Sequence, residues 1–377
     1  MPRSCLIYRF LGFGRERATR FDGGTHTWSH SVDLVYETAF RQFAIHQVPY
    51  VRSFGHGITG SLAAILMFLG AIAPARSLAQ TAPAKPSASQ LVIIDTDIGD
   101  DIDDAFALAL AERSPEFRIL GITTAFGDTT LRAQLALRFS SATGFGNIPV
   151  AAGVATPPKT NFTQAVYAEI GDKSKIQHAS GPDFLLDQVR KYPGQITLIA
   201  IGPQTNLAAA IDKDPATFRE LKRIVMMGGS VDRGYDDHAH ADPEWNILCD
   251  IPASRKVFAS GVPIYAMPLD ATILRFDQAR LDRLFQQDTQ LARQLQILYS
   301  EWSAATKQTT PTLFDPMAVA YAVTPSLCPT TPLHLTIDDQ GYTRRGPGEP
   351  NVNACLKSDP DTFFNFYLSR VADKTGR

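Results

Sequence analysis

The sequence has no excess of positive charge, no closely spaced cysteine pair and no long apolar run. Its 36 lysines and arginines stand against 38 aspartates and glutamates, which gives a net charge of -2 and a pI of 6.4. Proteins that bind nucleic acids usually carry a basic surface, so nucleic acid is not an expected partner. With 44% apolar and 20% charged residues over 377 positions, the chain is typical of a globular protein with one large α/β core or two modest ones.

The four cysteines lie far apart in the sequence, which excludes a zinc site built on pairs of thiolates. Cys328 and Cys355 both lie in the C-terminal region, where a disulfide could join them in an oxidising compartment. Their spacing alone does not show whether the two side chains meet.

The longest apolar run, residues 58–73, has the length of a signal-peptide core and is short for a transmembrane helix. The small residues of 75–79 suit cleavage before Gln80, and the Pro, Ala and Ser residues that follow are typical of a linker. We therefore expect export to the periplasm or the medium, with no stable membrane anchor after cleavage. The predicted organisation is a signal peptide at 51–79, a linker at 80–89 and a catalytic domain at 90–377.

A signal peptide normally begins at the first residue of a protein. Translation from Val51, read as an alternative start codon, would satisfy this rule and leave residues 1–50 outside the product. The alternatives are a membrane anchor or a buried helix at 58–73.

From residue 90 onward, short apolar runs alternate with stretches of helical periodicity. The apolar runs, typical of buried strands, lie at 91–94, 117–124, 149–152, 196–201, 224–227 and 262–267. The helical patterns lie at 105–111, 131–140, 206–211, 253–259, 281–307 and 363–368. This alternation predicts an α/β fold with a Rossmann-like core: an open, mostly parallel sheet with helices on both faces.

An acidic run at residues 95–104, directly after the first predicted strand, contains six aspartates. Ligands in this class of fold bind beyond the carboxyl ends of the strands. Carboxylates at close range raise one another's pKa unless a cation compensates them, and Ca²⁺ and Mg²⁺ prefer carboxylate oxygens. Gly99 permits a tight turn, and Asp103 and Asp104 are placed to open the next helix. The alternative is a helix cap followed by a solvated acidic loop.

The same run also fits a phosphatase of the haloacid-dehalogenase type, with Asp95 as nucleophile and Asp97 as acid and base. Such enzymes usually have Thr or Val two residues after the second Asp, where this sequence has Gly99. The pair Asp103 and Asp104 has no role in that pattern.

The acidic run resembles the opening signature of the inosine-uridine preferring nucleoside hydrolases, Asp-x-Asp-Pro-Gly-x-Asp-Asp-Ala. Two departures indicate a divergent member: Ile98 replaces the Pro, and two extra residues precede the Asp pair. Further segments match the family in the same order along the chain, at 122–128, 202–208, 225–229, 244–246 and 314–320.

This resemblance implies an enzyme that hydrolyses the N-glycosidic bond of ribonucleosides with a bound Ca²⁺, and a homo-oligomer, either dimer or tetramer. Asp97 would be the general base. The ion would be held by Asp97, Asp104, Asp315 and the carbonyl of Ile201. The ribose would be held by Asp103, Asp128, Asn246 and, near the 5′ end, Glu244. Because of the insertion, Asp100 and Asp101 compete for the places of Asp103 and Asp104.

Many family members place a His directly before the last metal-binding Asp, where it can protonate a purine, but here that residue is Phe314. The candidates for contact with the leaving base are His238, His240, Trp245, Tyr235 and Trp302. The base preference stays open. A protein that binds calcium and nucleoside, or calcium and a sugar, without turnover is a further alternative.

Overall fold

The computed structural model describes residues 89–146, 148–170, 176 and 180–372. The predicted signal peptide, the start at Val51 and nearly all of the predicted linker lie outside these residues. Within this described part, no helix combines the length and the apolar character needed to cross a bilayer.

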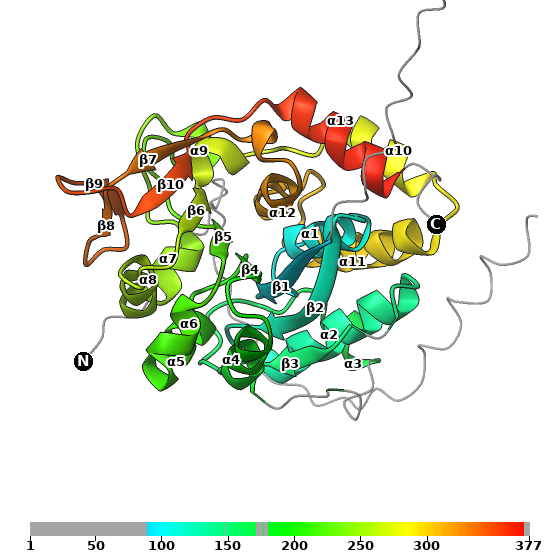
Figure 1. Ribbon diagram of the computed structural model, residues 1–377. Coiled ribbons are helices and arrows are strands. Elements are labelled where there is room, and N and C mark those ends of the chain that lie inside the picture. The colour runs from blue at the N-terminus through cyan, green and yellow to red at the C-terminus, as the bar shows by residue number, and fades with distance from the viewer. Residues whose placement is uncertain (1–88, 147, 171–175, 177–179, 373–377) are drawn as a thin grey trace, which may run out of the picture. The chain divides into compact units, whose positions relative to one another are not determined.

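A sheet of eight strands forms the centre of the fold, in the order β3-β2-β1-β4-β5-β6-β10-β7 (Figure 1). Only β7 runs antiparallel in it, paired with β10, and β8 and β9 form a separate two-stranded ribbon. The strands are β1 (Gln90–Thr96), β2 (Phe117–Thr124), β3 (Val150–Ala152), β4 (Thr197–Ala200), β5 (Arg223–Met227), β6 (Ile264–Met267), β7 (Thr330–Leu333), β8 (Leu335–Ile337), β9 (Thr343–Arg345) and β10 (Val352–Cys355).

Helices cover both faces of this sheet (Figure 1). One face is covered by α1 (Asp103–Glu112), α2 (Thr129–Ala142), α3 (Ala165–Glu169), α9 (Leu269–Thr272), α10 (Gln278–Phe285), α11 (Gln290–Thr306), α12 (Pro316–Val323) and α13 (Pro360–Val371). The other is covered by α4 (Gly181–Lys191), α5 (Thr205–Lys213), α6 (Pro215–Arg219), α7 (Trp245–Cys249) and α8 (Ile251–Phe258). Two short 3₁₀ turns are η2 (Tyr235–Asp237) and η3 (Pro325–Leu327).

The apolar character of the strands follows from their burial on both faces. In β1, Val92 and Ile94 join the core beneath α1 and α12, whereas Ile93 joins the core beneath α4 and α5. Successive side chains of a strand point to opposite faces, so a strand covered on both sides is apolar throughout. The predicted parallel sheet with helices on both faces is confirmed.

The predicted helix at 281–307 is wrong as a single element. It is two helices, α10 and α11, and α11 begins anew after Thr289, whose hydroxyl accepts the backbone N–H of Ala292 at 3.1 Å. A capping residue of this kind starts a helix and so separates it from the preceding one. The sequence patterns also missed α4, α12 and strands β7 to β10.

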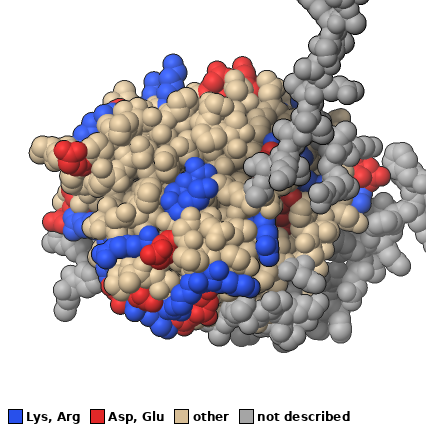
Figure 2. Space-filling view, viewed as in Figure 1, with Lys and Arg blue, Asp and Glu red and all other residues tan. Residues whose placement is uncertain are grey.

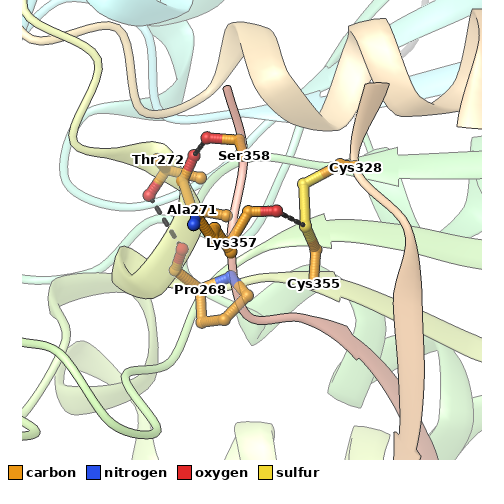
Figure 3. The surroundings of a disulfide bond; sticks show 7 residues. All are labelled: Pro268, Ala271, Thr272, Cys328, Cys355, Lys357 and Ser358. Carbon is orange, nitrogen blue, oxygen red and sulfur yellow. Dashed lines mark hydrogen bonds between the residues drawn. A yellow bond between two sulfur atoms is a disulfide. The ribbon is translucent and has the colours of Figure 1, made fainter. Parts of the chain in front are cut away.

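Cys328 and Cys355 form a disulfide, which answers the question that their spacing left open (Figure 3). Cys328 follows η3 and Cys355 ends β10, and both are fully buried. Just beyond the bridge, the Ser358 hydroxyl donates a hydrogen bond of 2.6 Å to the carbonyl of Ala271 in α9. The bridge therefore lies where the last strand meets the α9 helix.

Charged side chains of both signs lie next to one another on the face shown in Figure 2. Exposed ion pairs of this mixed kind include Arg255 with Asp339, at 2.7 Å, and Arg345 with Asp232, at 2.6 Å. Such pairs contribute little to stability individually.

Candidate active site

Side chains alternate at the end of β1, so the neighbouring residues Asp95 and Thr96 point to opposite faces of the sheet. The carboxylate of Asp95 accepts hydrogen bonds from the Thr123 hydroxyl and, at 2.7 Å, from the Asn206 side chain of α5. On the other face, the Thr96 hydroxyl donates to the carboxylate of Asp104 in α1. Burial raises the pKa of Asp95 to about 6. Asp95 thus ties β1, β2 and α5 together through these hydrogen bonds.

A cluster of buried aspartates lies where α1 and α12 begin. One carboxylate oxygen each from Asp103, Asp104 and Asp315 lies within 4.8 Å of the others. The backbone N–H of Asp315 donates to Asp103 Oδ2 at 3.2 Å, which joins the two helix starts. Asp103 and Asp104 open α1, as predicted. We call these three residues the acidic cluster.

Asp97 lies beside the acidic cluster, and the end of β4 passes directly against it. A Cβ atom at Gly202 would lie 2.8 Å from the backbone nitrogen of Asp97 and 2.9 Å from its Oδ1. Only glycine permits so close an approach of the two chains. This contact brings Ile201, the residue before Gly202, to the same end of the sheet as Asp97. The backbone N–H of Ile201 donates to the Asp95 carbonyl at 2.8 Å.

Burial is the main reason why these carboxyl groups have raised pKa values. It raises the pKa of Asp97 to about 7, although the nearby Arg132 guanidinium opposes the shift. The pKa values of Asp103, Asp104 and Asp315 lie well above the usual range, because burial and the neighbouring carboxylates act in the same direction. Four such groups bind protons unless a cation neutralises them. A donor set made only of oxygen atoms suits a hard divalent ion.

The buried side chain of Arg132 binds the loop at residues 97–100, which carries part of the acidic run. Nη1 of Arg132 donates to the carbonyls of Asp97 and, at 2.9 Å, of Ile98, and Nε donates to the carbonyl of Phe126 at 2.7 Å. Nη2 forms an ion pair of 2.9 Å with Asp100. Sequence reasoning missed Arg132. The available signal was its helical spacing of four and seven residues from Ala136 and Phe139, which places it on the buried face of α2.

The two additional aspartates of the loop have partners of their own. Asp100 binds Arg132 and accepts a hydrogen bond from the Thr160 hydroxyl. Asp101 accepts the backbone N–H of Ile102 at 2.7 Å and a hydrogen bond from the Trp302 side chain. Asp103 and Asp104, not Asp100 and Asp101, therefore occupy the acidic cluster.

The tight turn expected at Gly99 is present. Its φ of 127° is strained for any residue with a side chain, and a Cβ atom there would lie 2.3 Å from the Phe162 ring.

The predicted Glu-Trp-Asn segment follows β5 and begins α7. Glu244 caps this helix, and its carboxylate accepts the backbone N–H groups of Gly229, Asn246 and Ile247 at 2.9 to 3.2 Å. Burial raises the pKa of Glu244 to about 7, and its charge in turn raises that of Asp97. The Asn246 side chain donates to the Met227 carbonyl at 3.2 Å. Both side chains are buried at the same end of the sheet as Asp97.

Asp128 differs from the other predicted sugar-binding residues because its side chain is exposed. It caps α2 by accepting the backbone N–H of Leu131 at 3.0 Å. Phe126 and Gly127, directly before it, adopt φ angles of 67° and 63°. The structure thus places Asp128 after a sharp turn at the end of β2, outside the acidic cluster.

Aromatic rings lie next to the acidic cluster. The ring of Phe314, the residue before Asp315, contacts Tyr235 edge to face with centroids 6.1 Å apart. The Tyr235 hydroxyl accepts the backbone N–H of Trp245 at 2.9 Å. The Trp245 ring contacts the Phe126 ring edge to face, with centroids 5.7 Å apart.

Three other candidates for contact with the base have different partners. The imidazoles of His238 and His240 face Asp242, at 3.1 and 3.5 Å. Trp302 is buried in the core beneath α11.

Comparison with known proteins identifies the family. The profile of the inosine-uridine preferring nucleoside hydrolases matches residues 92–365. The chain belongs to this family. It is 33% identical to probable uridine nucleosidase 2 of Arabidopsis thaliana over 67% of this chain and 83% of that protein. It is 32% identical to the non-specific ribonucleoside hydrolase RihC of Escherichia coli over 70% of this chain and 89% of that protein.

Solved structures agree with the family assignment. A plant nucleoside hydrolase, the PpNRh1 enzyme, superposes with a TM-score of 0.66 and 27% identity over 75% of this chain and 99% of that one. A purine-preferring ribonucleoside hydrolase from Gardnerella vaginalis superposes with a TM-score of 0.66 and 25% identity, over 75% of this chain and 98% of that one. The predicted family, fold and enzyme class are confirmed. Family membership decides against the phosphatase interpretation.

Replacing Arg132 by Lys should destabilise the protein by about 2 to 4 kcal/mol, because three carbonyls and the partly buried carboxylate of Asp100 lose their fixed donors. Urea unfolding measures the change. Arg190→Lys, at an exposed ion pair on α4, is the matched control and should leave stability nearly unchanged. Equal stability of both variants would contradict the role assigned to Arg132.

The acidic cluster also predicts how stabilisation by Ca²⁺ depends on pH. In the folded protein without a cation, the raised pKa values favour the neutral carboxyls. Folding therefore loses stability as the pH rises from the unfolded-state pKa of about 4 through the folded-state pKa of Asp97, about 7, and through the raised pKa of Asp103. Binding of Ca²⁺ requires the ionised groups and removes this loss.

The increase in melting temperature on adding Ca²⁺ should thus be larger at about pH 8 than at about pH 5. Differential scanning fluorimetry measures it, with Asp315→Asn as a variant in which the increase should shrink. An increase that is the same at both pH values would contradict the argument.

Proposed function

We propose that this protein hydrolyses the N-glycosidic bond of ribonucleosides to ribose and free base, with Asp97 as general base and Ca²⁺ as the metal. The observation that carries the proposal is the buried acidic cluster beside Asp97 in a chain that belongs to the nucleoside hydrolase family. The names of its relatives include a uridine nucleosidase, a non-specific ribonucleoside hydrolase and a purine-preferring one.

The residues at this end of the sheet fit a calcium ion. Asp97, Asp104, Asp315 and the carbonyl of Ile201 would hold it, and each offers an oxygen atom. Burial is the main cause of the raised pKa values of these carboxyls, and repulsion between neighbouring carboxylates adds to it, with Arg132 as the opposing cation for Asp97 and Asp104. A bound Ca²⁺ would supply the missing positive charge, orient the ribose 2′ and 3′ hydroxyls and make a water more acidic.

The side chains at this site would accept the proton of the attacking water and hold the sugar. Its transition state resembles an oxocarbenium ion, so the sugar must be held rigidly while a water attacks. Asp97 would accept the proton of that water, since a carboxylate ionised by the bound cation can act as a general base. Asp103 and Asn246 would bind ribose hydroxyls, Glu244 would lie near the 5′ end, and Asp128 would contact the sugar from the exposed turn after β2.

The base would lie against the aromatic rings beside the acidic cluster. Phe314 cannot donate a proton, and the imidazoles of His238 and His240 are held by Asp242. We therefore assign the contact with the base to Trp245 and Tyr235, through stacking. Without an acid at position 314, the rate should depend strongly on how readily each base leaves.

Asp97→Asn should lower the turnover of nucleosides by about 10² to 10⁴-fold, because the amide cannot accept the proton of the attacking water. A panel of uridine, cytidine, inosine and adenosine, with and without chelator, followed by assay of free ribose, measures the effect. Asp187→Asn, at a position with 69% exposed side chain on α4, is the control.

Two results would overturn the proposal. Saturable binding of intact nucleoside without any ribose release would indicate a binding protein instead. Full activity of Asp97→Asn would remove Asp97 from the mechanism.

We further propose that the chain is exported and that it forms a dimer or tetramer. The disulfide between Cys328 and Cys355 supports export, because such bonds persist in oxidising compartments. N-terminal sequencing of the protein from the periplasm or the medium should give a mature start near Gln80. A product that retains residues 1–50 would contradict both the signal peptide and the start at Val51.

A further inference from the structure

The loop between β5 and α7 carries a second group of possible metal ligands. His238, His240 and Asp242 each offer one ligand atom, and these atoms lie within 4.8 Å of one another. The group combines two imidazoles with one carboxylate, whereas the acidic cluster offers only oxygen atoms. Imidazole nitrogen is a preferred ligand of Zn²⁺ and related transition metals, and carboxylates alone suit Ca²⁺.

The distances in this group are close to those of a tetrahedral zinc site. Nδ1 of His238 lies 3.1 Å from Asp242 Oδ2, and Nδ1 of His240 lies 3.5 Å from Asp242 Oδ1. A zinc ion with bonds of about 2.0 to 2.1 Å keeps its ligand atoms about 3.3 Å apart. Both imidazole rings face the carboxylate of Asp242, and their ring centroids are 5.0 Å apart.

The carboxylate at the centre of the group is held in place by the loop itself. The backbone N–H of Tyr235 donates to Asp242 Oδ2 at 2.9 Å, and the N–H of Asp242 donates to the Ser230 hydroxyl at 2.9 Å. A Cβ atom at Gly234 would lie 2.1 Å from Asp242 Oδ2, so the backbone there closes directly on the carboxylate. Hydrogen bonds that orient a ligand carboxylate are a regular feature of metal sites.

We propose that His238, His240 and Asp242 bind a transition-metal ion of the Zn²⁺ type, with solvent completing its coordination. The side chains of the two histidines are 40% and 69% exposed, and that of Asp242 is 21% exposed. The ion can therefore enter from solvent and exchange. This site is separate from the acidic cluster and does not depend on the proposed hydrolysis.

An ion at this site would fix the loop beside the acidic cluster. The same loop carries Tyr235, whose ring contacts Phe314 next to Asp315. Without the ion, one hydrogen bond joins His238 to Asp242, and Nδ1 of His240 lies 3.3 Å from the Ala241 carbonyl oxygen. With it, three coordinate bonds would hold residues 238 to 242 in one arrangement.

Titration with Co²⁺ tests the site, because Co²⁺ occupies zinc sites and gives a visible absorption spectrum that reports tetrahedral nitrogen and oxygen ligands. The purified full chain is first freed of metal and then kept in excess Ca²⁺, so that the acidic cluster is filled. We expect one Co²⁺ per chain with a tetrahedral spectrum, and its displacement by an equivalent of Zn²⁺.

His240→Ala and His238→Ala should each weaken Co²⁺ binding by at least about tenfold. His334→Ala, which removes a half-exposed histidine that hydrogen-bonds the Glu349 carbonyl, is the matched control and should leave binding unchanged. The melting temperature of each variant without metal shows that it is folded. Co²⁺ binding that is unchanged in both His238→Ala and His240→Ala, or no binding by the unaltered chain, would overturn the proposal.

Discussion

The concentration of buried negative charge at the carboxyl ends of β1 and β4 is the constraint on which the rest of the structure depends. Asp97 and the acidic cluster are buried, with 3 to 7% of each residue exposed, and unpaired carboxylates are unfavourable in such a position. Two features of the chain offset part of this charge. The guanidinium of Arg132 lies against the loop, and the cluster lies at the N-terminal ends of α1 and α12, where the helix dipoles are positive. The remaining charge is what makes the site suited to a divalent cation.

Arg132 also explains how the loop accommodates a sequence that departs from the family signature. The signature has a Pro after the second Asp, which fixes the backbone, whereas this chain has Ile98 and two inserted residues. In this chain the Arg132 side chain from α2 fixes the backbone instead. It binds the carbonyls of Asp97 and Ile98 and the carboxylate of Asp100. The inserted residues extend the loop without displacing Asp103 and Asp104.

Features that depend on neighbours in the sequence could be predicted, and features that depend on distant contacts could not. The alternation of apolar runs and helical patterns predicted the parallel sheet. The acidic run with Gly99 predicted the tight turn and the start of α1 at Asp103 and Asp104. The division of 281–307 into two helices depends on one hydroxyl of Thr289, which the apolar periodicity does not reveal. The spacing of Arg132 on α2 indicates that it is buried, but its contacts with the loop at 97–100 are tertiary, so the sequence does not show which carbonyls it binds. His238, His240 and Asp242 are close in the sequence, but only the folded loop shows that both imidazoles face the carboxylate.

The disulfide closes a covalent ring around the most irregular part of the chain. Its two cysteines are 27 residues apart and enclose β7, the β8 and β9 ribbon and most of β10. The ribbon carries exposed residues such as Arg344 and Arg345. A single proteolytic cut within this ring leaves two polypeptides joined by one covalent bond. A nicked molecule would therefore migrate as one band in a non-reducing denaturing gel and as two fragments after reduction.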